Sequence, residues 1–208
     1  MQYNSVIFDL GGVIVNLDYQ KTVAAFKKTL PDIASDFFLG QEAQLKFFSD
    51  YEVGKITTSE FMMSFNQHYA CQLNPKTFSE CWNAMILNLP LERIELLKKL
   101  KAKGKKIYLL SNINELHEKY FEEILDSYKL KSSFFGLFDK VYYSHKVGLR
   151  KPSPEIFKLV LSENHLNPAE TLFIDDTLGH VQSARELGIN AIHLQKNESI
   201  TQLSILKL

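Results

Sequence analysis

The sequence predicts an α/β fold in which a doubly wound parallel sheet carries an inserted all-helical cap. From residue 89 onward, short apolar runs alternate with helical patterns, which is typical of a parallel sheet covered by helices on both faces. Residues 17–88 separate this region from a first apolar run and contain helical patterns but no convincing strand. We therefore expect a Rossmann-like core of residues 1–16 plus 89–208 and a helical cap of residues 17–88. A chain of 208 residues is long enough for such a core with one insertion.

The composition argues against nucleic-acid and membrane proteins. The 24 basic and 24 acidic residues balance, so no global field would attract nucleic acid or anionic lipid. No apolar stretch approaches the ~20 residues that span a bilayer. The first residues lack the pattern of a secretory signal, and Cys71 and Cys81 belong to no metal-binding motif. We expect a cytoplasmic monomer or homodimer without nucleic-acid or membrane partners.

The first strand is expected to present a carboxylate at its C-terminal end. Residues 5–8 form an apolar run that stops at Asp9 and is followed by the pair Gly11-Gly12, which is typical of a buried strand ending in a tight turn. A helix capped by Asp18 should run through Lys28, before Pro31.

Further helical patterns cover residues 41–52 and 58–68, and the spacing of Thr57 and Glu60 is that of a capping box. Strands and helices then alternate to the C-terminus. The expected helices are residues 91–103, 114–125, 154–163 and 178–187, and the expected strands are residues 106–110, 140–143, 171–174 and 191–194. Ser153 should cap the third of these helices, because Pro154 suits its first position.

Polar residues follow four of the predicted strands. They are Asp9, Ser111 with Asn112, Lys151, and the pair Asp175 and Asp176. In parallel sheets the ligand crevice lies outside the carboxyl ends of the strands, so these groups should converge there. Clustered carboxylates raise one another's pKa or require a cation, and Mg²⁺ prefers a few carboxylates with room left for phosphate oxygens.

This combination of residues favours the transfer of a phosphoryl group from a small phosphorylated metabolite. Asp9 is best interpreted as a nucleophile that forms an aspartyl-phosphate, while Ser111 and Lys151 hold the phosphoryl oxygens. Each residue has a plainer interpretation when it is taken alone: a turn or cap residue for the aspartates and the serine, and a solvated surface charge for the lysine. Their order, each at the matching end of a strand, favours a shared site.

The sequence resembles the haloacid dehalogenase superfamily of aspartyl-phosphate hydrolases over essentially its whole length. The matching segments are Phe8-Asp9-Leu10-Gly11-Gly12-Val13, Leu110-Ser111-Asn112, Gly148-Leu149-Arg150-Lys151-Pro152 and Phe173-Ile174-Asp175-Asp176. The resemblance implies that Asp9 is the nucleophile and that Ser111 and Lys151 bind the phosphoryl group. It also implies a Mg²⁺ site made by Asp9, the Gly11 carbonyl, Asp175 and Asp176. We further expect Gly12, Asn112 and His117 to contribute to substrate binding.

The sequence departs from this family at Gly11, where most of its phosphatases carry an aspartate that acts as the general acid. Such a group is typically worth ~10² to 10⁴ in rate. The sequence also resembles the sugar-phosphate phosphatases of the glucose 1-phosphate type, which share this glycine, and an anomeric hydroxyl leaves more easily than an ordinary alcohol. His117 could contact the phosphoryl site or donate a proton, although a packed histidine is the plainer interpretation. A second departure is His180, where relatives usually have asparagine.

We weighed three alternatives to a phosphatase. A non-catalytic module could have kept the phosphate or partner pocket and lost turnover with the acid missing at Gly11. A haloacid dehalogenase would use Asp9 without a metal, which leaves the pair Asp175 and Asp176 without a purpose. A receiver domain has its acidic pair before the acceptor aspartate and no inserted cap, so the order of motifs argues against it.

Overall fold

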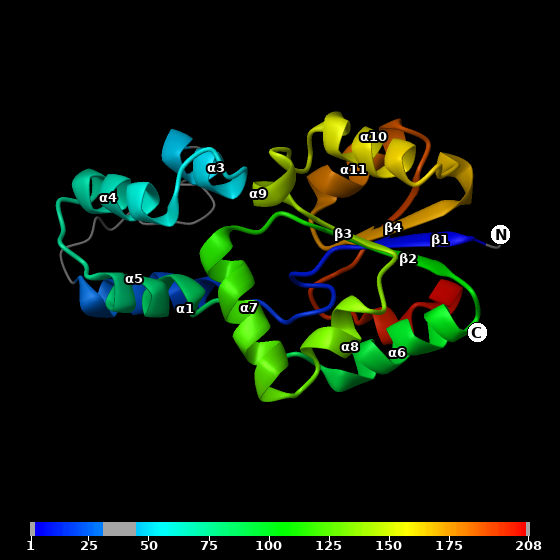
Figure 1. Ribbon diagram of the computed structural model, residues 1–208, viewed down its shortest axis with the longest axis horizontal. Coiled ribbons are helices and arrows are strands. Elements are labelled where there is room, and N and C mark those ends of the chain that lie inside the picture. Colours follow the sequence, from blue (N-terminus) through cyan, green and yellow to red (C-terminus); the bar gives the residue numbers. More distant parts are fainter. Residues whose placement is uncertain (1–2, 31–44, 207–208) are drawn as a thin grey trace.

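The computed structural model describes residues 3–30 and 45–206, and a five-stranded parallel sheet forms its centre (Figure 1). The strands are β1 (Ser5–Phe8), β2 (Lys106–Ser111), β3 (Lys140–Tyr143), β4 (Thr171–Asp175) and β5 (Asn190–His193). Their order is β3-β2-β1-β4-β5. The predicted fold class is therefore confirmed.

The strand order places a crevice beside β1. From β1 the chain moves outward to β2 and β3, then crosses back to β4 on the other side of β1 and continues outward to β5. Ligand sites of open α/β sheets lie at such a reversal, outside the carboxyl ends of the strands. Phe8 pairs with Ile174 in this register, so Asp9 and Asp175 both follow at the carboxyl edge.

Helices cover both faces of the sheet (Figure 1). One face packs against α6 (Leu91–Ala102), α7 (Glu115–Ser127) and α8 (Lys131–Phe135), and the other packs against α10 (Pro154–Glu163) and α11 (Leu178–Glu186). The three central strands, β2, β1 and β4, are almost entirely buried, as their nearly continuous apolar sequences require. A single turn, α9 (Ser144–Val147), follows β3, and short 3₁₀ turns lie at η1 (Pro168–Glu170), η2 (Ile200–Gln202) and η3 (Ser204–Leu206).

A second group of helices, which we call the cap helices, lies beyond the carboxyl ends of the strands (Figure 1). It contains α1 (Tyr19–Thr29), α3 (Lys46–Glu52), α4 (Thr58–His68) and α5 (Pro75–Asn83). These helices share a hydrophobic cluster of their own, rich in aromatic rings, in which Tyr51 stacks on Phe61 with 4.2 Å between ring centroids. Residues 41–44 of the predicted 41–52 helix lie outside the described residues.

Two backbone segments join the cap helices to the core side by side. The Leu87 amide donates to the Asn16 carbonyl at 2.9 Å, and the Asn16 amide donates to the Asn88 carbonyl at 3.1 Å. Leu17 and Ile86 form an antiparallel bridge next to them. The entry and the exit of the helical segment are therefore held together by hydrogen bonds.

The predicted helix caps have mixed outcomes. Thr57 and Glu60 form the expected capping box, and the Asp18 side chain accepts from the Gln20 amide at the start of α1. Ser153 is the N-cap residue of α10 and Pro154 takes its first position, as predicted, but the Ser153 hydroxyl donates to the Glu155 carboxylate instead of forming a capping bond to the backbone of the helix. Among the described residues, no helix has the length and apolar character needed to cross a bilayer.

Candidate functional site: an acidic cluster facing a cavity

The Lys151 ammonium lies at the centre of the site and is fully buried. Its Nζ is 2.9 Å from Asp9 Oδ1 and 2.6 Å from Asp175 Oδ2, and it also donates to the Leu110 carbonyl at 2.9 Å. Asp9 follows β1, Leu110 belongs to β2 and Asp175 ends β4, so the lysine joins three neighbouring strands. The buried ammonium is therefore paired on all sides, as a charge in the interior requires.

Three carboxylates gather around this lysine. Asp9, Asp175 and Asp176 each offer an oxygen, and these oxygens lie within 4.8 Å of one another. Asp175 also accepts from the Thr177 amide at 2.8 Å and from His180 Nδ1 at 3.0 Å, which fixes its orientation at the start of α11. Carboxylate oxygens at this spacing are the donor set that hard divalent cations prefer. The residues present therefore fit Mg²⁺.

The charges in the cluster do not balance without a further cation. Burial raises the pKa of Asp9 to about 7, and the charges of Asp175 and Asp176 add to this rise against that of Lys151. Burial and Asp175 also raise the pKa of Asp176. Burial acts to raise the pKa of Asp175, but Lys151 and His180 outweigh it and the pKa is lowered. A bound cation would favour the ionised form of all three acids.

The loop after β1 depends on a glycine. Gly12 has a positive φ of 70°, and a Cβ at this position would lie 2.1 Å from Asp176 Oδ2. Only a residue without a side chain allows Asp176 to approach this loop so closely. Gly11 is different, since a Cβ there would meet only the end of the flexible Leu17 side chain, at 2.5 Å from Cδ1. Part of the space that a side chain at residue 11 would need is therefore filled by Leu17.

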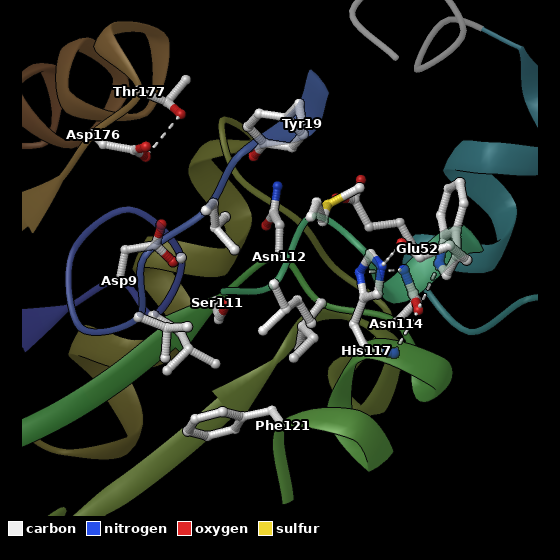
Figure 2. Close-up of a pocket in the computed structure, with 18 of the residues that line it drawn as sticks. Asp9, Tyr19, Glu52, Ser111, Asn112, Asn114, His117, Phe121, Asp176 and Thr177 are labelled. Atoms are coloured by element: carbon white, nitrogen blue, oxygen red, sulfur yellow. Dashed lines mark hydrogen bonds between the residues drawn. The ribbon is translucent and has the colours of Figure 1, made fainter. Parts of the chain in front are cut away.

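Ser111 is the last residue of β2, and Asn112 follows it on the same edge of the sheet. The buried Ser111 lines the cavity described below, near Asp9 (Figure 2). Asn112 Nδ2 donates to the Lys151 carbonyl at 2.8 Å, and the Lys151 amide donates back to Asn112 Oδ1 at 2.9 Å. The Asn112 side chain thus binds the main chain of Lys151, a contact that the sequence alone did not indicate.

A cavity of about 560 Å³ extends from the acidic cluster to the cap helices. Asp9, Ser111 and Asp176 line one end, whereas Val23 of α1 and Phe48 of α3 belong to the cap side. Figure 2 shows Asp9 and Asp176 on one side of the cavity and Asn114 and His117 on the other. The site therefore consists of a charged end contributed by the sheet and a wall contributed by the cap helices.

His117 belongs to this far wall and is bound within the protein. Its Nε2 lies 3.2 Å from the Trp82 carbonyl and its Nδ1 3.1 Å from Asn114 Nδ2, while its ring stacks on that of Trp82 with centroids 5.2 Å apart. Burial lowers the pKa of His117 to about 4, although the bond to the Trp82 carbonyl opposes the shift. A neutral imidazole accepts from Asn114 and donates to Trp82.

Several contacts between the cap helices and the core were not predicted from the sequence. Glu52 at the end of α3 pairs with Arg150 at 2.7 Å, directly before Lys151. Gly54 has a φ of 68° and packs so tightly that a Cβ would lie 2.1 Å from the His145 carbonyl oxygen. The Leu116 amide donates to the Tyr51 hydroxyl at 3.1 Å. Among the residues that make these contacts, only Gly54 is of a type that could have indicated a turn.

Comparisons with known proteins agree with this geometry. The model of the family described as haloacid dehalogenase-like hydrolase matches residues 6–194. D-ribitol-5-phosphate phosphatase of Bacteroides thetaiotaomicron is 32% identical over 187 residues, which cover 88% of each chain. Sesquiterpene phosphatase astK of Aspergillus oryzae is 27% identical over 203 residues, covering 92% of this chain and 90% of that protein.

A solved structure supports the same assignment. The crystal structure of an aspartate-to-alanine variant of a HAD family enzyme from Bacteroides thetaiotaomicron, in complex with magnesium and inorganic phosphate, superposes with a TM-score of 0.86 at 31% identity, covering 96% of this chain and 97% of that one. Together with the family match and the order of the four motifs, this similarity leads to one conclusion: the chain belongs to the haloacid dehalogenase-like hydrolases.

Proposed function

We propose that the protein is a Mg²⁺-dependent phosphatase that hydrolyses a small phosphomonoester, a sugar phosphate, through an aspartyl-phosphate on Asp9. The observation that carries this proposal is the pairing of Lys151 with both Asp9 and Asp175 at the charged end of the cavity. The family membership and the phosphatases among the relatives support it.

The proposed reaction has two steps. Asp9 attacks the phosphorus, forming a bond from its carboxylate oxygen while the bond to the substrate's ester oxygen breaks, and the leaving group departs as an alcohol that takes its proton from water. Water then hydrolyses the aspartyl-phosphate, which releases inorganic phosphate and restores the Asp9 carboxylate. In both steps the Lys151 ammonium and the Ser111 hydroxyl hold phosphoryl oxygens, where charge has to be stabilised. Asn112 supports Lys151 through its main chain.

The proposed metal ligands are Asp9, the Gly11 carbonyl, Asp175 and Asp176. When bound, Mg²⁺ would supply positive charge against the repulsion between a phosphate dianion and the carboxylates. Gly12 keeps Asp176 close to the loop that carries Asp9. In the same proposal, residues 17–88 form the cap that closes the substrate cavity.

The substrate class is proposed from the relative D-ribitol-5-phosphate phosphatase, which by its name acts on the phosphate of a five-carbon sugar alcohol. The name of the fungal relative indicates a terpene phosphate instead, so the organic group differs among the relatives. Gly11 supplies no general acid in this chain. We therefore expect substrates with good leaving groups to react faster than unactivated alkyl phosphates.

Hydrolysis of p-nitrophenyl phosphate tests the proposal, because this leaving group needs little help from an acid. We expect turnover with Mg²⁺, none with a chelator, and a loss of at least about 10³-fold in kcat for Asp9→Asn. Asp18→Asn is a matched control, because asparagine caps α1 as well as aspartate does. Phosphate binding without any release of p-nitrophenol would favour the non-catalytic module instead.

A further inference from the structure

The far part of the cavity contains polar groups that are bound to one another. Tyr51 OH lies 2.9 Å from Thr58 Oγ1 and accepts from the Leu116 amide. Both ring nitrogens of His117 have partners, and Asn114 Oδ1 accepts from the His117 amide at 3.0 Å. These side chains therefore have little capacity left for the hydroxyl groups of a substrate, since a new hydrogen bond would have to replace an existing one.

Nearer the charged end, polar groups are also engaged. Asn112 uses both ends of its amide on Lys151, and Glu52 is paired with Arg150. A sugar phosphate bound close to Asp9 could break the Glu52–Arg150 pair or use the exposed side chains of Tyr19 and Gln20. Such a ligand would occupy only the part of the cavity that adjoins the sheet.

The rest of the wall is apolar. It is made by side chains from the core, the cap helices and the two segments that join them: Leu17, Val23, Phe48, Met85, Ile86 and Phe121. With a volume of about 560 Å³, the cavity falls in the usual range of ~300 to 1,000 Å³ for small-molecule sites. Among the described lining residues these apolar side chains form one continuous part of the wall, and such a surface favours hydrocarbon over water or a polyol.

We infer that the protein also accepts amphiphilic phosphomonoesters, with the phosphate at Asp9 and Lys151 and a hydrocarbon tail in the apolar part of the cavity. This inference rests on the proposed function for its phosphate end. It adds a second class of substrate to that function, primary alkyl or prenyl phosphates. Their tails gain from burial along the wall formed by Phe48, Met85 and Phe121.

Trp82 allows binding to be measured without catalysis, because it is the only tryptophan of the chain and lines the cavity. We would titrate the wild-type protein, with Mg²⁺ present, with n-alkylphosphonates from butyl to decyl, whose carbon–phosphorus bond is not hydrolysed. We expect the fluorescence of Trp82 to change on binding and Kd to fall by up to about fourfold per added methylene. Equal Kd values for butyl and decyl, or no change in emission at any length, would overturn the inference.

Turnover of the matching n-alkyl phosphates gives a second measurement. All members of this series have nearly the same leaving group. A rise in kcat/KM with chain length would therefore come from binding of the hydrocarbon tail and not from a difference in leaving-group chemistry. Met85→Glu should abolish the rise by placing a charge in the apolar wall. Met63→Glu is the matched control, since Met63 is 60% exposed and does not line the cavity.

The two proposals fail in different ways. If phosphonate affinity rises with chain length but no phosphomonoester is hydrolysed, the proposed function is wrong and the tail site stands. If p-nitrophenyl phosphate is hydrolysed while kcat/KM is the same for butyl and decyl phosphate, the inference about the tail is wrong and the phosphatase stands.

Discussion

Asn112 and Lys151 are 39 positions apart, yet the side chain of one pairs with the main chain of the other through two hydrogen bonds of 2.8 and 2.9 Å. The loop after β2 therefore fixes the loop that carries the buried ammonium. Because Lys151 Nζ must reach both Asp9 and Asp175, a shift of its backbone would disturb both ion pairs. Asn112 is thus a positioning residue for the lysine.

Asn112→Ala should reduce kcat by about 10 to 10² and KM much less, since misplacing a catalytic group by about 1 Å can cost 10²-fold in rate. It should also destabilise the fold by about 1 to 3 kcal/mol, because the main-chain groups of Lys151 lose their partners in a partly buried place. Steady-state kinetics and urea unfolding would test this. An unchanged kcat would show that the Asn112 pair does not position Lys151.

The acidic cluster was predictable because the sequence marks it locally. Asp9, Ser111, and the pair Asp175 and Asp176 each end an apolar run, and parallel strands place such ends on one edge. The depth of Lys151 was less apparent, since a lysine in a loop is usually exposed, and here its two carboxylate partners come from other strands. Neither its burial nor the Asn112 contact leaves a pattern in the adjacent sequence.

Two short helices and one long-range ion pair were not predicted from the sequence. The helix α5 was not predicted as a separate element, although Asn74 as its N-cap and Pro75 at its first position were signals that could have found it. The single turn α9 is too short for hydrophobic periodicity to reveal. The pair of Glu52 and Arg150 joins residues almost 100 positions apart, so only the folded chain brings it together.

Gly54→Ala should weaken the contact between the cap helices and the core. Gly54 and Gly104 both have positive φ, of 68° and 76°, so alanine strains the backbone at either position. Of the two, only Gly54 would bring the new Cβ against another part of the chain, the His145 carbonyl, because at Gly104 no atom of the described residues beyond its chain neighbours lies within 4 Å of the Cβ position. We expect Gly54→Ala to lose about 1 to 3 kcal/mol more stability than Gly104→Ala and to raise KM. Equal losses in thermal unfolding would refute the importance of this contact.

Gly11→Asp should favour poor leaving groups. The new side chain needs the space that Leu17 Cδ1 occupies at 2.5 Å from the Cβ position, so the double variant with Leu17→Ala is the better background. A general acid there should raise the rate for alkyl phosphates by at least about tenfold relative to p-nitrophenyl phosphate, within the range of ~10² to 10⁴ typical of such catalysis. If both substrates respond equally, the missing acid does not explain the leaving-group preference.

His117 should make the fold sensitive to acid. Burial lowers its pKa to about 4 in the folded chain, below an ordinary value of about 6.5, so the unfolded chain binds more protons between these values. The stability of wild type should therefore fall as pH drops from 6.5 toward 4. His117→Gln should remove up to about 1.4 kcal/mol of that fall per pH unit. Parallel slopes for wild type and variant in chemical unfolding at several pH values would contradict this assignment.

A covalent bond from Asp9 to phosphorus is the central step of the proposed reaction, and a single-turnover experiment can detect it directly. Excess protein with Mg²⁺ would be mixed with an aryl ester of radiolabelled phosphate, quenched in acid within the first turnover and digested for peptide mapping. We predict a hydroxylamine-sensitive label on the peptide containing Asp9, absent in Asp9→Asn. Release of labelled phosphate without any protein-bound label during the turnover, or a label on another residue, would contradict the central claim.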